Sequence, residues 1–256
     1  MKKLRILVLL LVISGGRYAY SIEYPYAEEL PSGDFMHVAM DNLGTEYYRY
    51  ELFSWRLGFN SSITYRDYTT LSASAFNNAG TEIQSELGYS FTPEQLPWDQ
   101  GPYANRLFFS ENDYGVNNWD ALSLAYIVQT DGSFIYCQDH TVGADSQGDI
   151  LVSAAVYGAD NELCNIDLGK RVNAGMLVFN EYEYPFSVTE QTHLILHEFA
   201  HLFGLIHLEY LQDPKPYQCD SLMIRKKEDC SMPASTIGSA DAAALNYLKT
   251  DNSIGP

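Results

Sequence analysis

Three stretches of the chain carry the hydrophobic spacing or the end signals of helices. Apolar residues recur at four-residue intervals across residues 71–87, which places them on one face of a helix. A second helix is predicted over residues 188–203, where Ser187 and Glu190 fit a capping box at its start. A third is predicted over residues 239–248. Helices are therefore expected both before and after the central part of the chain.

The central part is rich in β-branched and aromatic residues, with Gly and Asp at the joins, which is typical of strands. The segments predicted as strands are residues 62–66, 106–109, 123–129, 133–138, 149–156 and 176–179. Pro93, Pro97 and Pro102 indicate irregular chain after the first helix. Strands come first and helices flank them, so the order of elements suits both α+β and α/β architectures.

The N-terminus has the pattern of an export signal. Lys2, Lys3 and Arg5 form a short basic start, and residues 6–13 follow as an unbroken apolar run of eight. That run is far shorter than the ~20 residues that a transmembrane helix needs. Residues 1–21 are therefore predicted to be a signal peptide. The mature protein is expected to be secreted, extracellular or periplasmic, without a membrane anchor.

Residues 22–51 are rich in Tyr, Glu and Pro and show little periodicity. We interpret them as an N-terminal arm or a short pro-segment. The whole chain is 46% hydrophobic and only 19% charged, which is typical of a folded globular protein. Residues 52–256 are long enough for one domain, and we expect that domain to carry the chemistry.

The balance of charge argues against two classes of partner. The net charge of −18 becomes −22 once residues 1–21 are removed, because that segment contributes only cations. An acidic surface of this kind repels nucleic acid and anionic membranes. Neither is expected to bind this protein.

The chain has four cysteines, Cys137, Cys164, Cys219 and Cys230, and an even number in an exported chain predicts two disulfides. Four cysteines allow three connectivities. Proximity in the sequence favours Cys137–Cys164 and Cys219–Cys230. A cysteine-ligated metal is the competing interpretation, but the chain contains no C-x-x-C pair.

The strongest chemical signal is the segment 197–207, HEFAHLFGLIH. His197 and His201 are four residues apart, so on a helix they share one face and can bind the same metal ion. Neutral imidazoles suit zinc, which keeps one ligand position for water in catalytic sites. Glu198 lies at the edge of that face. It can act there as a general base toward the water without being a ligand itself.

Gly204 and His207 extend the motif beyond the helix. Glycine tolerates the left-handed conformation that ends a helix and turns the chain sharply. His207 can then return to the metal from outside the helix as a third ligand. Two histidines on a helix face are often only partly buried polar residues. Three imidazoles and a carboxylate, however, are costly to bury without a metal, so zinc is the preferred interpretation.

The segment 197–207 resembles the extended zinc signature of the metzincin metallopeptidases. That clan has a methionine-containing turn beneath the metal, for which Met223, sixteen residues after His207, is the first candidate and Met232 the second. The resemblance implies an α+β zincin domain with a twisted mixed sheet, an active-site helix, a Met turn and a C-terminal helix. It also implies an edge strand that pairs with substrate, for which residues 149–156 are the candidate.

The activity that this resemblance implies is that of a zinc-dependent endopeptidase, acting as a monomer on protein or peptide substrates. His197, His201 and His207 would hold one catalytic Zn²⁺, with Glu198 as the base. One alternative is an exported zinc protein without peptidase activity that uses the same fold to bind a partner, although an intact Glu198 argues against it. Another is a β-rich adhesin in which the histidines are incidental.

The residues after the motif differ from those of the known subfamilies. Matrixins carry Ser or Thr directly after the third histidine, where this chain has Leu208. Astacins carry Glu at that position, and Glu209 is one position late. Residues 239–245 are similar to the closing helix of matrixin-like enzymes. We therefore interpret the chain as a divergent, matrixin-like metzincin.

Two further groups of polar residues have open interpretations. His193 shares the helix face of His197 and is interpreted as a surface residue or as a support for the ligands. Residues 145–149 offer oxygen ligands for Ca²⁺, but their spacing matches no complete loop, so a solvated turn is the simpler interpretation.

Latency by a pro-segment is a separate hypothesis. Some metzincins block their zinc with a pro-segment cysteine, but no cysteine precedes Cys137 here. An aspartate of the N-terminal arm, such as Asp34 or Asp41, is the candidate for that role.

Overall fold

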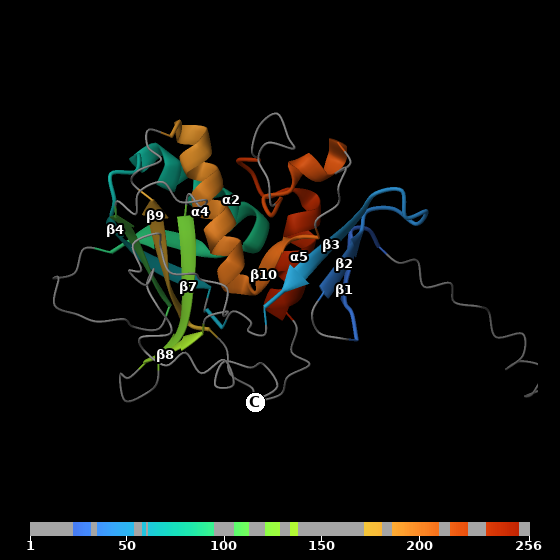
Figure 1. Cartoon of the computed structure of the whole chain (residues 1–256), viewed down its shortest axis with the longest axis horizontal. Coiled ribbons are helices and arrows are strands. Elements are labelled where there is room, and N and C mark those ends of the chain that lie inside the picture. The colour runs from blue at the N-terminus through green and yellow to red at the C-terminus, as the bar shows by residue number, and fades with distance from the viewer. Residues whose placement is uncertain are drawn as a thin grey trace, which may run out of the picture.

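The structure is a computed structural model that describes residues 23–31, 35–53, 58–59, 61–94, 105–112, 121–128, 134–137, 172–180, 186–209, 216–224 and 234–250. These residues form a mixed α+β architecture with two sheets and three α-helices. The helix α4 (Val188–Phe203) runs between the larger sheet on one side and α5 (Ser239–Thr250) with the smaller sheet on the other (Figure 1).

The larger sheet is mixed. In spatial order its strands are β5 (Ser90–Pro93), β4 (Ser62–Tyr68), β6 (Arg106–Asn112), β9 (Ala174–Asn180), β7 (Ala121–Val128) and β8 (Phe134–Cys137). The first four are parallel, whereas β7 runs antiparallel to β9 and β8 antiparallel to β7. The strands predicted over described residues are all present, and the predicted mixed sheet is confirmed.

The smaller sheet is antiparallel and joins two distant parts of the chain. Its strands are, in order, β1 (Tyr26–Glu29), β2 (Phe35–Ala39), β3 (Tyr47–Leu52) and β10 (Leu205–Leu208). The segment 22–51, which shows little periodicity in the sequence, thus contributes three strands. Alternate residues of β2 and β3 are buried. Phe35 and Tyr47 begin these strands at less buried positions, and these aromatic residues hide the alternation.

The helix α2 (Ala73–Leu87) confirms the helix predicted over residues 71–87. Ser72 caps its start by accepting a hydrogen bond from the Ser74 N–H, and Gly88 ends it with a φ of 70°. The apolar residues at four-residue spacing form its buried face, which packs on α4 and β5.

The short strand β5 occupies chain that the prolines predicted to be irregular. Four residues are too few for a periodic signal. The strand is stabilised by the aromatic rings that Phe91 contacts. The Phe91 ring stacks on Tyr65 with centroids 4.5 Å apart, and Tyr65 stacks on Phe76 at 5.1 Å. Phe109 meets Phe76 edge to face at 4.9 Å. This aromatic cluster joins α2 to the larger sheet.

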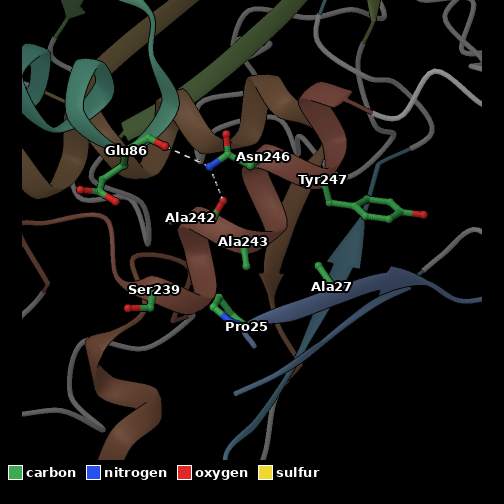
Figure 2. Close-up of a pocket in the computed structure, with 8 residues that line it drawn as sticks. All are labelled: Pro25, Ala27, Glu86, Ser239, Ala242, Ala243, Asn246 and Tyr247. Carbon is green, nitrogen blue, oxygen red and sulfur yellow. Dashed lines mark hydrogen bonds between the residues drawn. The ribbon is translucent and has the colours of Figure 1, made fainter. Parts of the chain in front are cut away.

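The C-terminal helix α5 connects both halves of the molecule. It packs on β1 and β2 of the smaller sheet and also contacts α2 and α4. A pocket lies where α5, β1 and the end of α2 meet (Figure 2). There the Asn246 side-chain amide donates hydrogen bonds to the carbonyl oxygens of Glu86 (3.0 Å) and Ala242 (2.9 Å). None of the described residues that line this pocket is a histidine, so it is separate from the predicted metal ligands.

Several sequence predictions fall outside the described residues. These are the signal peptide over residues 1–21, the calcium segment 145–149, the edge strand 149–156 and Met232. None of the helices in the described ranges combines the length and the apolar character that crossing a bilayer requires.

The contact of β9 with α4 gives a test of this packing. A Cβ on Gly175 would lie 2.7 Å from Cδ1 and 2.9 Å from Cδ2 of Leu202, which is fully buried. Gly175→Ala is therefore expected to lower the free energy of unfolding by about 1–3 kcal/mol, measured by urea denaturation. Gly80→Ala is the control. Its Cβ would lie 3.2 Å from the Phe91 ring, and alanine favours a helix over glycine by about 1 kcal/mol. Equal losses in both variants would contradict the close approach.

Candidate metal centre

The helix α4 carries the first two histidines of the motif. The predicted capping box is present: the Glu190 N–H donates to Oγ of Ser187 (3.3 Å), and the Ser187 N–H donates to the Glu190 carboxylate (2.7 Å). From this start the helix continues without interruption to Phe203. His197 and His201 therefore lie one turn apart on one face, with ring centroids separated by 4.7 Å.

Gly204 ends α4 in the left-handed region, with a φ of 109°, and its N–H donates to the His201 carbonyl (3.0 Å). The chain then enters β10, which carries His207. The His207 ring centroid lies 5.4 Å from that of His197 and 5.0 Å from that of His201. One ligand nitrogen from each of the three histidines lies within 4.8 Å of the others. The three predicted ligands thus form a group that could hold a metal ion.

Backbone carbonyls decide which ring nitrogen of two histidines carries the proton. Nδ1 of His197 lies 2.7 Å from the carbonyl oxygen of Leu222, and Nδ1 of His201 lies 2.7 Å from that of Leu205. A carbonyl oxygen only accepts, so each Nδ1 donates and each Nε2 keeps its lone pair. This is the tautomer that a metal ligand needs, and the hydrogen bonds also fix the ring orientations.

Burial keeps His201 uncharged. It lowers the pKa of His201 well below the usual value of 6.5, and the nearby rings of His197 and His207 lower it further. The backbone hydrogen bond to Leu205 opposes the shift. His201 is therefore neutral near pH 7 and able to donate a lone pair to a cation.

The donor set fits a divalent transition metal. Three imidazole nitrogens suit zinc, and they leave room for a further ligand in a tetrahedral site. Two nitrogens bound to one zinc ion, each at ~2.1 Å, lie about 4 Å apart at most. The observed separations, up to 4.8 Å, are close to that span, so small side-chain rotations would bring the three nitrogens to one ion.

Glu198 places a carboxylate beside this group. It follows His197 on α4, about 100° further around the helix, and is only 4% exposed. Its carboxylate therefore lies at the edge of the ligand face and within the protein. A base at this position can reach a small molecule bound next to the histidines without taking a ligand position.

Asp241 of α5 supports one candidate ligand through the backbone of Leu222. Its carboxylate accepts hydrogen bonds from the hydroxyls of Tyr50 (2.8 Å) and Ser221 (2.7 Å) and from the Leu222 N–H (2.8 Å). The carbonyl of the same Leu222 accepts the hydrogen bond from His197. The position of Asp241 thus fixes the group that orients the His197 ring.

Met223 lies in the same turn, shortly after the 3-10 helix η4 (Pro216–Asp220), and its side chain is fully buried. Its carbonyl accepts a hydrogen bond from the Leu208 N–H at 2.8 Å. The turn of Leu222 and Met223 therefore contacts both the helix that carries His197 and the strand that carries His207.

His193 is buried, with 3% of its surface exposed, so the interpretation as a surface residue is wrong. Its Nδ1 donates a hydrogen bond to the Ala234 carbonyl oxygen at 2.6 Å. The contact ties the chain that leads into α5 to α4. His193 therefore lies in the protein interior, and its role as a support for the ligands stays a prediction.

The sequence did not point to two groups that hold the site. For Asp241 a signal exists, because it is the one carboxylate in a short alanine-rich helix and lies on its buried face. The Leu222 carbonyl has no signal, because a backbone group takes its role from the fold and not from its side chain.

Two of the predicted disulfide cysteines are described. Cys137 and Cys219 are both disulfide-bonded. Cys164 and Cys230 lie outside the described residues, so the pairing of Cys137 with Cys164 and of Cys219 with Cys230 stays a prediction.

A scan against protein-family models finds no match, and a search of curated proteins finds no significant relative. Family and function are therefore inferred from the residues of the site and their geometry.

The role of Asp241 can be tested through stability. In Asp241→Ala, the hydroxyls of Tyr50 and Ser221 and the Leu222 N–H lose a buried acceptor, and each such loss costs about 1–3 kcal/mol. The free energy of unfolding is expected to fall by about 3 kcal/mol or more, measured by urea denaturation. Tyr50→Phe removes one donor and is expected to cost about 1 kcal/mol. A loss in Asp241→Ala no larger than in Tyr50→Phe would contradict the arrangement.

The lowered pKa of His201 predicts a loss of stability in acid. Below the usual His pKa of 6.5, the unfolded chain binds a proton that the folded, metal-free protein does not bind. The free energy of unfolding of chelator-treated protein is therefore expected to decrease as the pH falls from 6.5 toward the lowered pKa. Urea titrations at successive pH values measure this decrease. His201→Gln should flatten it, and an unchanged slope would show that another group is responsible.

Proposed function

We propose that the protein is a zinc-dependent endopeptidase of the metzincin type. The proposal is carried by one observation, the convergence of three histidine ligand nitrogens within 4.8 Å beside the buried Glu198. The order of elements agrees with the layout that the resemblance implies. A mixed sheet is followed by the ligand helix, the glycine turn, the third histidine, a buried methionine turn and a C-terminal helix.

His197, His201 and His207 are the residues that would hold the zinc. A bound zinc ion supplies Lewis acidity, which polarises a peptide carbonyl and lowers the pKa of a water ligand to roughly 7. The protein contributes the orientation of the ligands, because the carbonyls of Leu222 and Leu205 hold two of the rings with Nε2 free of a proton.

Glu198 transfers a proton from the attacking water to the leaving amide nitrogen. As a water oxygen bonds to the peptide carbonyl carbon, the Glu198 carboxylate takes a proton from that water. It then gives the proton to the amide nitrogen as the carbon–nitrogen bond breaks, so that an acid and an amine are released. The carboxylate returns to its starting state after each cycle.

Action outside the cytoplasm is part of the proposal. The export pattern of residues 1–21 supports it, and so do the disulfide-bonded Cys137 and Cys219, because disulfides persist in oxidising compartments. The net charge of −18 argues against nucleic acid as the substrate.

The general base is tested by Glu198→Gln, which keeps the shape of the side chain but cannot take a proton. Hydrolysis of casein is expected to fall by about 10²–10⁴-fold, because a positioned base contributes that factor. Zinc content, measured by atomic emission, is expected to stay near one ion per chain. A chelator should abolish hydrolysis by the wild type, and added zinc should restore it.

Glu190→Gln is the matched control. It makes the same change on the same helix at the capping box, where glutamine also serves, so hydrolysis should stay near the wild-type rate. Wild-type rates in Glu198→Gln would exclude this mechanism. A wild-type protein that binds zinc but cleaves no protein would favour the alternative, an exported zinc protein without peptidase activity.

A further inference from the structure

The strand β10 that carries His207 is held from both sides. On one side it pairs with β3, which belongs to the N-terminal segment. On the other side the Leu208 N–H donates to the Met223 carbonyl at 2.8 Å. The third histidine therefore depends on a strand whose position is set by two segments that are distant from it in sequence.

The pairing with β3 fixes both ends of β10. At its start, the Phe53 N–H donates to the Gly204 carbonyl at 2.8 Å. At its end, the Glu209 N–H donates to the Arg49 carbonyl at 2.7 Å. His207 lies between these two hydrogen bonds, so β3 limits where its backbone can be.

The register shifts within this short strand. Leu205 pairs with Leu52 and Leu208 pairs with Tyr50, which leaves an irregularity where Ile206 and His207 lie. A bulge of this kind breaks the alternation of side chains and redirects them. Because both ends are paired with β3, the irregularity is confined to the residues that present His207 to the other two histidines.

Side chains add little to this pairing. Arg49 forms an ion pair with Glu209 (3.2 Å), and its guanidinium lies 4.0 Å above the Phe35 ring. Both charged side chains are about a third exposed, at 31% and 35%, and a pair of this kind contributes roughly 0–1 kcal/mol. The backbone hydrogen bonds are therefore the main constraint on β10.

The sheet that supplies β3 is part of the protein core. Met36, Val38 and Tyr48 are buried in the same hydrophobic cluster as the apolar residues of α4. Tyr50 donates its buried hydroxyl to Asp241, the residue that also holds the turn behind His197. In Figure 1 the three N-terminal strands lie beside α5, and the sheet that they form continues from β3 to β10.

Of the two candidate aspartates for latency, Asp34 lies outside the described residues, and Asp41 has a local role. The Asp41 carboxylate accepts hydrogen bonds from the N–H groups of Leu43 (2.9 Å) and Thr45 (3.0 Å), and it also contacts the Thr45 hydroxyl. It stabilises the turn between β2 and β3 and is not directed at the histidines.

We propose that the strands β1–β3 are a permanent part of the metal centre, in which the backbone of Arg49 positions His207. The proposal rests on the zinc site of the proposed function but not on peptide hydrolysis. It predicts that residues 26–52 stay with the domain when zinc is bound. Removal of this segment as an inhibitory pro-segment would destroy the third ligand position.

The backbone contact is tested by Glu209→Pro, with Glu209→Ala as the matched control. Proline removes the N–H that donates to Arg49, whereas alanine keeps it and loses only the exposed ion pair. The zinc dissociation constant, measured by competition with a chromogenic chelator, is expected to rise about 10–100-fold for proline, as for other groups that orient ligands. For alanine it should rise by less than about threefold. Co²⁺ absorption should show altered coordination in the proline variant only.

A second experiment leaves both strands unchanged. A recognition sequence for a specific protease is placed between Phe53 and Gly58, and the full chain is cut there after folding. The two pieces are expected to elute together and to keep zinc. Denaturant should separate them, and the C-terminal piece refolded alone should not bind zinc with the original affinity. If Glu209→Pro does not fold, this experiment still tests whether β1–β3 are needed for the third ligand position.

The outcomes separate the two proposals. Dissociation of the N-terminal piece from a remainder that keeps zinc at wild-type affinity would overturn the role of β1–β3, as would equal zinc affinity in the proline and alanine variants. A wild-type protein that binds zinc but hydrolyses no peptide would overturn only the peptidase. A wild-type protein without affinity for zinc would overturn both.

Discussion

The buried carboxylate of Asp241 joins the segments on which the candidate metal centre depends. It accepts hydrogen bonds from Tyr50 of β3 and from Ser221 and Leu222 of the turn, while itself belonging to α5. Burial raises the pKa of Asp241, and these hydrogen bonds oppose the shift. A carboxylate away from water needs such donors, so their positions are constrained. Through the Leu222 carbonyl the constraint reaches His197.

The helix α4 can carry polar ligands because the rest of it is packed tightly. Its buried apolar residues pack on α2 and on the larger sheet, and Leu202 fills the space left by the missing side chain of Gly175. The helix therefore cannot shift along the sheet without a steric clash. His197 and His201 are polar but not isolated, because each donates to a backbone carbonyl. Rigid packing and satisfied hydrogen bonds together fix the positions of these two residues on α4.

Hydrophobic spacing and helix-end signals in the sequence predicted the helices α2, α4 and α5, and runs of β-branched and aromatic residues predicted most strands of the larger sheet. These patterns did not predict the smaller sheet, for two physical reasons. In β2 and β3 aromatic residues occupy both faces, so the alternation of buried and outward positions is concealed. The strand β10, like β5 of the larger sheet, has only four residues, and its conformation comes from neighbouring strands and not from local preference.

The sequence by itself determined the chemistry of residues 197–207. Helical geometry puts His197 and His201 on one face, and a glycine that accepts a φ of 109° ends the helix before His207. These are local rules that any fold obeys. Only the tertiary structure decided which groups hold the ligands, because Tyr50 and Asp241 are 191 residues apart and β3 meets β10 from the other end of the chain. Contacts of this kind depend on packing, and no local pattern records them.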